Sequence, residues 1–292
     1  MIVTVALSPS VDQTYVVDST AADHRPRQTL RLAGGNGLNV ARAVRALDGD
    51  VFATGIVGGA SGRWIVSSLE AEGIPFAPVV GRATTRTRMS LAEAGGALTE
   101  VYEEPSPVDR GEWEALEEVL TSAIVEHQPT WLVISGLVPP GAPADAVARL
   151  LAVGGESGAR IAVDCAGDGL GQALAAGTDL VTASLRHART FTGTDGTPAE
   201  VGALLATRAG GDTAVVVTSD DGGAWATFPD TGGLDIVPEP AGPYRHGHHD
   251  AFLAGLVHEL DRQASPAKAL AAAASVAAAN DRVPGAGRLA LD

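Results

Sequence analysis

The sequence predicts an α/β protein with a mostly parallel central sheet. Three observations support this prediction. The chain has 292 residues, of which 45% are hydrophobic and 19% charged, so it can bury a large core. Short runs rich in Val and Ile alternate with helical patterns, and such runs are typical of strands covered by helices on both faces. The chain shows no repeat and no long linker, so we expect one domain over residues 1–292.

The expected strands are six apolar runs at residues 2–7, 51–56, 131–134, 160–163, 179–181 and 213–217. The expected helices lie at residues 37–47, 62–72, 144–153, 199–208, 250–262 and 266–280. Two further segments, residues 13–31 and 85–102, alternate apolar with polar positions and interrupt this order. They predict a small separate sheet that could serve as a lid or as a dimer contact.

The composition excludes several classes of function. A formal net charge of −15 argues against a general grip on nucleic acid or on an anionic membrane, because both require a basic face. Cys165 is the single cysteine, which excludes an internal disulfide, and Lys268 is the single lysine, which excludes a Walker A motif. The first residues do not resemble a signal peptide. We therefore expect a cytoplasmic protein with small soluble partners.

Two segments rich in small residues or histidine each precede an expected helix. Residues 33–43 read Ala-Gly-Gly-Asn-Gly-Leu-Asn-Val-Ala-Arg-Ala, and residues 247–250 read Gly-His-His-Asp. Backbone amides at a helix N-terminus can approach an anionic ligand, and a carboxylate such as Asp250 can accept a proton from a hydroxyl. The alternatives are a tight turn with a glycine-rich N-cap for the first segment and an aspartate N-cap for the second.

Several motifs follow one another along nearly the whole chain. They are Leu-Ser-Pro-Ser-Val-Asp at residues 7–12, Gly-Gly-Asn-Gly-Leu-Asn-Val-Ala at 34–41, Val-Gly-Gly at 57–59, Thr-Arg at 85–86, Ile-Ser-Gly-Leu-Val-Pro-Pro-Gly at 134–141 and Gly-His-His-Asp-Ala-Phe-Leu-Ala-Gly at 247–255. In this order and spacing the motifs resemble the ribokinase-like (phosphofructokinase B) family, most closely its 1-phosphofructokinase and tagatose-6-phosphate kinase branch. The resemblance implies a ribokinase-like three-layer α/β/α sandwich with a small β-sheet lid, a homodimer through that lid, and ATP-dependent phosphoryl transfer to a sugar hydroxyl.

The resemblance also assigns roles to individual residues. Asp250 would be the catalytic base, beside an anion hole formed by Gly247, His248 and His249. A sugar or sugar phosphate would contact Asp12, Gly34, Gly35, Asn36, Asn39 and Arg86, with Arg86 meeting its phosphate. Arg88, next to this motif, is our candidate to replace the positive charge of the lysine that the branch usually has at position 36. ATP and Mg²⁺ would lie near Ser184, Thr218, Gly223 and Asn280, beneath an alanine-rich helix. No dedicated metal site of the protein is expected.

The sequence departs from the family pattern on both sides of the expected site. On the acceptor side, Asn36 stands where the branch usually has lysine, and Leu137 stands where it commonly has serine. On the nucleotide side, Ser184-Leu-Arg-His187 replaces an Asn-x-x-Glu motif, which removes a hard oxygen ligand suited to magnesium. Asp220 replaces a glycine and brings negative charge toward ATP. Each change weakens the expected binding of a phosphorylated ligand.

His249 stands where the family's anion hole has glycine. A positive φ at this position would strain a histidine, and the loss of one oxyanion donor typically lowers the rate roughly 10²–10³-fold. The imidazoles of residues 246–249 could instead donate to phosphate, bind a transition metal or lie in a solvated loop. A modified catalytic site is the leading interpretation because Asp250 is retained.

Three functions remain open from the sequence. The first is an active kinase for a sugar or sugar phosphate, favoured by Asp12, Asn39, Arg86 and Asp250. The second is a family member that has lost catalysis and senses a ligand or binds a partner. The third is a kinase for an unphosphorylated sugar or a nucleoside, favoured by the missing lysine at position 36.

Overall fold

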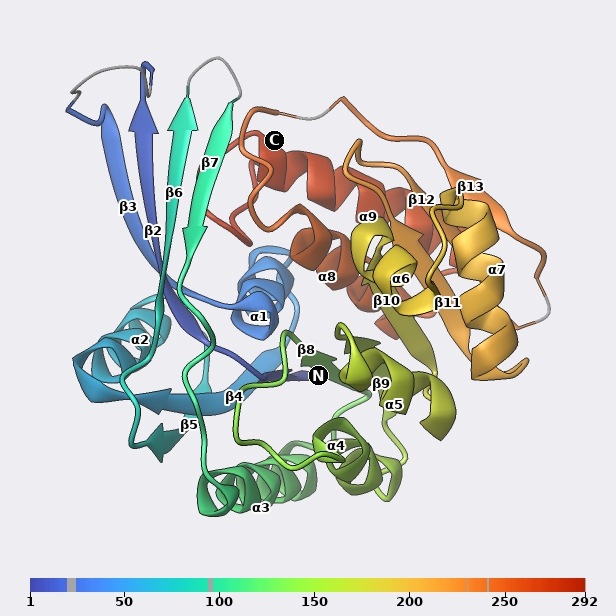
Figure 1. Cartoon of the computed structure of the whole chain (residues 1–292), viewed down its shortest axis with the longest axis horizontal. Helices are drawn as coiled ribbons and strands as arrows, with labels where there is room; N and C mark the ends of the chain where they lie inside the picture. Colours follow the sequence, from blue (N-terminus) through green and yellow to red (C-terminus); the bar gives the residue numbers. More distant parts are fainter. Residues whose placement is uncertain (20–24, 94–96, 230, 241, 292) are drawn as a thin grey trace.

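The computed structural model describes residues 1–19, 25–93, 97–229, 231–240 and 242–291. Its main element is a nine-stranded sheet in the order β13-β12-β11-β10-β9-β8-β1-β4-β5 (Figure 1). The seven strands from β11 to β5 in this order run parallel, and β12 and β13 continue the sheet in antiparallel pairing. The strands are β1 (Ile2–Ala6), β4 (Val51–Gly58), β5 (Phe76–Gly81), β8 (Trp131–Ser135), β9 (Arg160–Asp164), β10 (Leu180–Ser184), β11 (Ala214–Thr218), β12 (Ala224–Thr227) and β13 (Leu234–Ile236).

Helices cover both faces of this sheet. They are α1 (Asn36–Ala46), α2 (Gly59–Ala71), α3 (Arg110–His127), α4 (Ala146–Gly155), α5 (Asp168–Ala176), α6 (Leu185–Thr192), α7 (Pro198–Ala209), α8 (His248–Asp261) and α9 (Pro266–Asp281). Side chains of α1, α2, α8 and α9 pack in one buried apolar cluster, and those of α3 to α7 pack in a second. The predicted three-layer α/β/α architecture is therefore confirmed.

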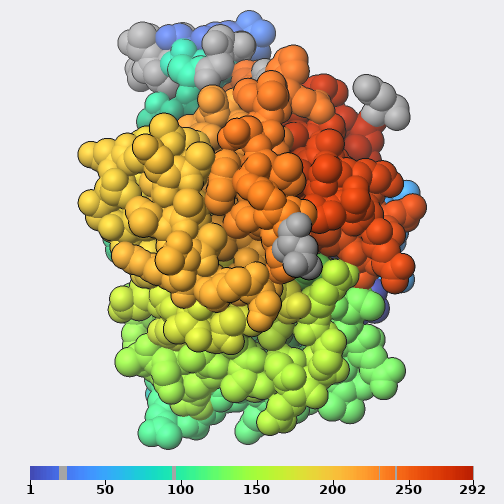
Figure 2. Space-filling view, turned by 90° about the vertical axis from the view of Figure 1, so that its right-hand side faces the viewer, coloured from blue at the N-terminus to red at the C-terminus, as the bar shows by residue number. Residues whose placement is uncertain are grey.

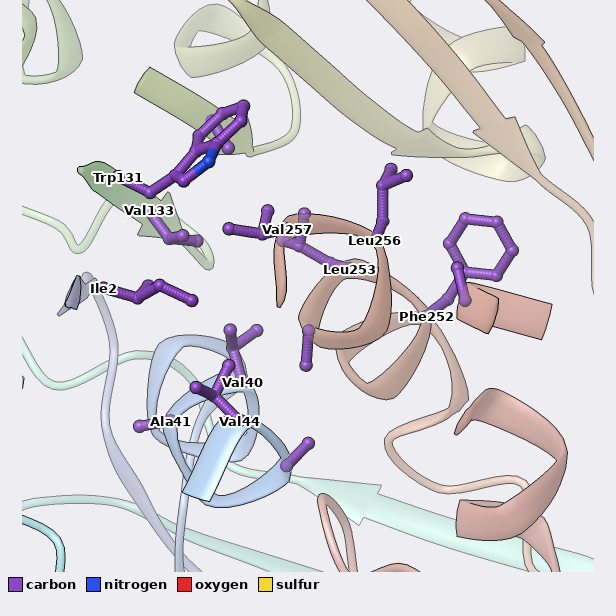
Figure 3. Packing of buried hydrophobic residues seen from close by; sticks show 14 of the residues in the cluster. Ile2, Val40, Ala41, Val44, Trp131, Val133, Phe252, Leu253, Leu256 and Val257 are labelled. Carbon is purple, nitrogen blue, oxygen red and sulfur yellow. The ribbon is translucent and has the colours of Figure 1, made fainter. Parts of the chain in front are cut away.

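The alternation of strand side chains creates these two cores. In β1, Ile2 belongs to the first cluster and Val3 to the second, and in β8 Val133 and Leu132 divide in the same way. Figure 3 shows the first cluster, where α1 and α8 lie side by side against β1 and β8. This packing fixes the N-terminal ends of α1 and α8, which carry the residues of the candidate site.

The two interrupting segments form a second sheet, called the small sheet below. It contains β2 (Ser10–Val17), β3 (Gln28–Gly34), β6 (Thr87–Glu93) and β7 (Leu98–Tyr102), in the order β3-β2-β6-β7. Residues 20–24 and 94–96 of the predicted segments lie outside the described residues. The tip of the small sheet, in blue and teal, stands above the C-terminal part of the chain in Figure 2. Because β2 begins four residues after β1 ends, this sheet lies beside the carboxyl end of the central sheet.

Several elements were not predicted. Helices α3, α5 and α6 and strands β5, β12 and β13 are absent from the expected list. Helix α3 had a readable signal, since Asp109 and Glu112 form a capping box and its buried side chains recur every three or four residues. Strand β5 contains Pro78, and β12 and β13 have only four and three residues. Among the described residues, no helix combines the length and the apolar character needed to cross a membrane.

Candidate active site

A buried pair at the carboxyl end of the parallel strands forms the centre of the site. Asn39 in α1 is fully buried and Asp250, in the first turn of α8, is 5% exposed. The Nδ2 of Asn39 donates a hydrogen bond to Oδ2 of Asp250 at 2.8 Å. The structure thus brings together two of the predicted site residues from helices far apart in the chain.

The carboxyl of Asp250 titrates near neutral pH. Burial and, to a smaller extent, the nearby carboxyl of Asp164 raise the pKa of Asp250, which is about 7 in the folded protein. The hydrogen bond from Asn39 and the positive charge of Arg88 lower this pKa and oppose the rise. A carboxyl with these properties suits proton transfer at physiological pH.

Arg42 fixes the orientation of the Asn39 amide. Its Nη1 donates to Oδ1 of Asn39 at 3.4 Å and to the backbone oxygen of Ala286 at 3.2 Å. Its Nε donates to Glu72 at 2.5 Å, in an ion pair at the end of α2. Because Arg42 can only donate, it selects the amide orientation in which Asn39 presents its NH₂ group to Asp250. Sequence reasoning missed Arg42, although an arginine among the buried positions of α1 was a signal.

Asp12 lies in β2 of the small sheet and is 4% exposed. Its Oδ1 accepts a hydrogen bond from Ser10 Oγ at 2.6 Å, and its Oδ2 lies 3.1 Å from Nε2 of His246. Burial raises the pKa of Asp12, but the hydrogen bond and charge of His246 outweigh it and lower the pKa to about 2. A Cβ at Gly34 would lie 2.1 Å from Cγ of Asp12, so only glycine leaves room for this carboxylate.

The two arginines predicted to meet a substrate phosphate lie at the start of β6, Arg86 just before the strand and Arg88 within it. Arg86 is 8% exposed and donates to the backbone oxygens of Glu103 and Ser8 at 3.0 and 3.2 Å. The guanidinium of Arg88 lies 4.5 Å from the ring centre of Tyr102. In the described part of the chain, the buried Nε atoms of both arginines have no hydrogen-bond partner. Both arginines therefore retain a free donor for an anion.

The first turn of α8 begins at Gly247, which has a φ of 83°. His249 is not strained, because the only described non-glycine residues with positive φ are Asp48, Gln128 and Gln263. The sequence-based concern about strain at His249 therefore does not apply. Gly247 takes the left-handed conformation instead, and a Cβ there would lie 2.5 Å from Cβ of Ala286.

The three imidazoles near α8 face different carboxylates. His246 contacts Asp12 and Glu100, and His248 Nδ1 lies 2.9 Å from Oδ2 of Asp281. His249 Nε2 lies 3.8 Å from Oδ1 of Asp220, and burial lowers the pKa of His249 to about 4. Over the described ranges, no group of three or more His, Cys, Asp or Glu side chains is placed to hold a metal ion.

His248 and His249 each retain a buried nitrogen without a partner. These atoms are Nε2 of His248 and Nδ1 of His249, counted over the residues that the structure describes. Both lie at the N-terminus of α8, where the helix dipole favours negative charge. In place of the missing glycine, His249 can donate to an oxyanion in the tautomer that carries its proton on Nδ1, whereas His248, whose Nδ1 donates to Asp281, can donate from Nε2 only as an imidazolium.

The predicted nucleotide loop lies against this helix end. Thr218 ends β11, and Gly223 accepts a hydrogen bond from Ser219 N at 2.8 Å to close a tight turn. A Cβ at Gly222 would lie 3.3 Å from Nη2 of Arg245 and 3.4 Å from Cε1 of His248. Thr218, Gly223 and the start of α8 therefore belong to one region of the surface.

Other predicted residues have positions that the sequence could not give. Asn36 begins α1 and its side chain hydrogen-bonds Asp164. Gly35 has a φ of 97°, and a Cβ there would lie 2.7 Å from the backbone oxygen of Ser8. Ser184 caps α6 by accepting from His187 N. Asn280 is fully buried. Its Nδ2 donates to the backbone oxygen of His246 at 3.0 Å and its Oδ1 accepts from Gly287 N at 2.9 Å, so the amide joins the turn before α8 to the segment after α9.

An apolar groove lies between β13 and α9. It has a volume of about 500 Å³ and is lined by Leu234, Ile236, Val237, Leu270, Ala271 and Ser275, among others. Figure 2 shows the orange surface around β13 beside the orange-red surface of α9. The small alanine side chains of α9 leave space for a flat ligand, in the region where the alanine-rich helix was expected to close over adenine.

The carboxyl end of the mostly parallel sheet brings together a carboxyl with a pKa near neutrality and a helix N-terminus that can bind an anion. This combination is typical of enzymes that transfer phosphoryl groups to small molecules. The comparison with known families agrees. The chain belongs to the pfkB family of carbohydrate kinases, whose family model matches residues 5–291. The family membership predicted from the motifs is therefore confirmed.

Individual relatives extend this finding. The chain is 29% identical to 1-phosphofructokinase of Rhodobacter capsulatus over 265 residues, which cover 88% of this chain and 83% of that protein. It is 32% identical to ATP-dependent 6-phosphofructokinase isozyme 2 of Escherichia coli over 179 residues, which cover 60% of this chain and 57% of that protein. The second match thus spans little more than half of the relative's length.

A solved structure gives the same result for the fold. The structure of phosphofructokinase-2 from Escherichia coli in complex with fructose-6-phosphate is similar to this chain with a TM-score of 0.82 and 26% sequence identity. The similarity covers 95% of this chain and 92% of that chain. The small sheet and the nine-stranded sheet are therefore both features of a ribokinase-like kinase fold.

Proposed function

We propose that this chain transfers the γ-phosphoryl group of ATP to a hydroxyl group of a sugar phosphate, with Asp250 as the general base. The observation that carries the proposal is the hydrogen bond of 2.8 Å between Asn39 and Asp250 beside the N-terminus of α8. Burial gives Asp250 a pKa of about 7, so its carboxylate can accept the proton that the acceptor hydroxyl loses. The relatives named as phosphofructokinases support the choice of a sugar phosphate as acceptor.

The acceptor would lie between the small sheet and α1. The carboxylate of Asp12 would accept hydrogen bonds from sugar hydroxyls, and the backbone of Gly34 and Gly35 would approach the sugar closely. Arg86 and Arg88, whose Nε atoms are buried without partners in the described structure, supply donors for a phosphate group. These arginines compensate for the absence of lysine at Asn36.

The nucleotide would extend from the groove between β13 and α9 to the start of α8. Adenine fits the apolar lining of the groove, and the phosphates would pass the turn that contains Thr218 and Gly223. Nδ1 of His249 would donate to the transferring phosphoryl group in the tautomer that protonates it, and Nε2 of His248 would do so in the imidazolium form. Positioning and charge neutralisation of this kind account for most of the catalysis in phosphoryl transfer.

Mg²⁺ would enter with the nucleotide and would neutralise charge on its phosphates. Such an ion is commonly held by one or two carboxylates together with substrate phosphates, and the candidates are the half-buried Asp164 at the end of β9 and the buried Asp250 in the first turn of α8. Burial raises the pKa of Asp164, so this group becomes a ligand only as it loses its proton. The donor set thus fits an ion delivered with ATP better than a resident one.

The assembly and location are part of the same proposal. Strand β7 is an edge strand of the small sheet and exposes Val101 and Tyr102, which supports a homodimer formed through this sheet. The small sheet would act as a lid over a single kinase domain of residues 1–292. The partners are small molecules, and we propose a cytoplasmic location with no nucleic-acid or membrane partner.

Two observations favour alternative functions. The side chain of Asn36 is bound to Asp164, which favours an acceptor without a phosphate group, such as a plain sugar or a nucleoside. His249 lies 3.8 Å from the carboxylate of Asp220, whose negative charge would oppose the phosphates of ATP, and this favours a catalytically impaired protein that senses a ligand or binds a partner.

The proposal is tested by measuring ADP release from ATP and Mg²⁺. The acceptors are fructose 1-phosphate, fructose 6-phosphate, tagatose 6-phosphate, unphosphorylated hexoses and nucleosides. We expect turnover with a sugar phosphate, and a decrease in kcat of roughly 10²–10⁴-fold in Asp250→Asn. The matched control is Asp195→Asn, an exposed position, which should keep full activity.

Each alternative has its own result in this assay. Turnover with a hexose or a nucleoside only would replace the proposed acceptor. A folded protein that is stabilised by a sugar phosphate or by ATP, but shows no turnover with any acceptor, would be a binding protein instead.

A further inference from the structure

His246 lies between two carboxylates that come from different strands of the small sheet. Its Nδ1 is 2.6 Å from Oε1 of Glu100, and its Nε2 is 3.1 Å from Oδ2 of Asp12. A neutral imidazole carries a proton on only one ring nitrogen. Because both nitrogens face carboxylate oxygens, both must donate, and the geometry therefore selects the imidazolium form of His246.

The two contacts join three separate parts of the fold. Asp12 belongs to β2 and Glu100 to β7, and β6 lies between these strands in the small sheet. His246 belongs to the turn that leads into Gly247 and α8, and its backbone oxygen accepts from Asn280 in α9. One side chain thus connects the small sheet to the beginning of the helix that carries Asp250.

The charges around His246 favour its protonation. The groups that act on it are Asp12 from β2, Arg88 from β6, Glu100 from β7 and Asp250 from α8, and Tyr102 of β7 hydrogen-bonds Glu100. Burial and Arg88 disfavour the cation, but the two hydrogen-bonded carboxylates outweigh them and raise the pKa of His246 to about 9. The residue is 7% exposed, so water cannot readily replace either carboxylate.

We propose that His246 is a positioning residue of the acceptor site: its imidazolium holds Asp12 in place and fastens the small sheet to the turn that begins α8. That this site binds the acceptor rests on the function proposed above, whereas the connection between the small sheet and the turn does not. His246 does not touch the reacting atoms. Its loss would leave Asp12 and Glu100 without their shared cation and would release Asp12 from its orientation.

The proposal predicts a specific dependence on pH. Deprotonation leaves His246 with one N–H group, so it can donate to only one of the two carboxylates. The affinity for the acceptor should then decrease as the pH rises through the titration of His246, while the affinity for ATP changes little. Glu100→Gln should behave differently from His246→Gln, because a neutral histidine can still donate to Asp12 when residue 100 is an amide.

The first experiment is independent of activity. The ring Cε1–H signals of the histidines are followed by NMR from pH 5 to 10 in the wild type, His246→Gln and Glu100→Gln, and the signal missing from His246→Gln identifies His246. We expect a titration midpoint of about 9 in the wild type and a lower midpoint in Glu100→Gln. A wild-type midpoint at or below the ordinary histidine value of about 6.5 would overturn the proposal.

The second experiment measures KM for fructose 6-phosphate and for ATP at pH 7. We expect a KM for the sugar phosphate roughly 10-fold higher in His246→Gln, a smaller rise in Glu100→Gln, and an ATP KM within about twofold of wild type. His258→Gln, at the opposite end of α8, is the control and should change neither value. Equal changes in both KM values would overturn the positioning role. If no acceptor is turned over, the proposed kinase function fails, and the NMR titration alone decides whether His246 fastens the small sheet.

Discussion

The side-chain amide of Asn39 donates a hydrogen bond of 2.8 Å to Oδ2 of Asp250, although 211 positions separate the two residues in the chain. The packing of α1 against α8 creates this contact, as the neighbouring side chains of Val40, Val44, Leu253 and Val257 show in Figure 3. The contact affects the chemistry directly, because a donor to the carboxylate stabilises its charged form.

Removal of the Asn39 donor should shift the pH dependence of the reaction. The proposed base, Asp250, is active as a carboxylate, so kcat/KM should rise as the pH passes through the pKa of Asp250, which is about 7. In Asn39→Leu, the lost hydrogen bond raises this pKa, and the rising limb should move to higher pH by about one pH unit. The measurement is kcat/KM between pH 5 and 9. An unchanged limb would show that the amide does not act on Asp250.

Arg42 should affect the same rising part of the pH profile of kcat/KM, because it orients the amide of Asn39. In Arg42→Met, the amide is free to turn its Oδ1 toward Asp250, which disfavours the carboxylate and moves the limb in the same direction. Arg45→Met, at an exposed position of the same helix, is the matched control. A loss of stability in Arg42→Met without any shift of the limb would indicate a purely structural role.

The acidic pair around His246 should control stability at low pH. The pKa values of Asp12 and Glu100 are lowered to about 2 from 3.8 and 4.5, so their stabilising contribution is present above pH 5 and is lost as the pH falls toward 2. The pKa of Asp250 is raised instead, so its protonation changes the stability between about pH 7 and pH 4 and adds little to the slope below pH 4. We expect Glu100→Gln to reduce the slope of the unfolding free energy between pH 4 and 2 by roughly half, measured by urea denaturation. An unchanged slope would contradict the assigned contacts.

Glycine at position 249, the residue that the family has there, should not improve the backbone geometry of the first turn of α8. His249 already has helical backbone angles, so His249→Gly should lower the free energy of unfolding by about 1 kcal/mol, as glycine does in helices. His249→Ala should be neutral or stabilising in the same urea titration. A glycine variant more stable than the alanine variant would mean that residue 249 is strained.

The orientation of Asp12 should depend on the absence of a side chain at Gly34. A Cβ at this position would lie between 2.1 and 2.3 Å from three atoms of the Asp12 carboxyl group. Gly34→Ala should therefore displace Asp12 and raise the KM for the acceptor roughly 10-fold or more. Gly155→Ala, where a Cβ would meet nothing within 4 Å, is the control. A normal KM in Gly34→Ala would exclude Asp12 from acceptor binding.

Local patterns allowed the fold to be predicted further than the site. Apolar strands and amphipathic helices are visible in short stretches of sequence, so β1, β8, α1 and α8 were expected nearly at their observed bounds. The polar α6 and the three-residue β13 offered too little pattern to be recognised. Pairings between distant residues could not be predicted from local patterns either. The histidine cluster was noticed, but the partners of His246 lie 146 and 234 positions away in the chain.

The place of β1 in the central sheet has a consequence for synthesis on the ribosome. This strand is made before both of its partners, since it pairs with β4 on one side and with β8, residues Trp131–Ser135, on the other. At about 5–20 residues per second, the second edge of β1 stays open for on the order of ten seconds after the strand is made. An apolar strand with an open edge invites pairing with other chains. The nascent chain should therefore depend on chaperones until β8 leaves the exit tunnel, and a pause in translation before that point should increase aggregation.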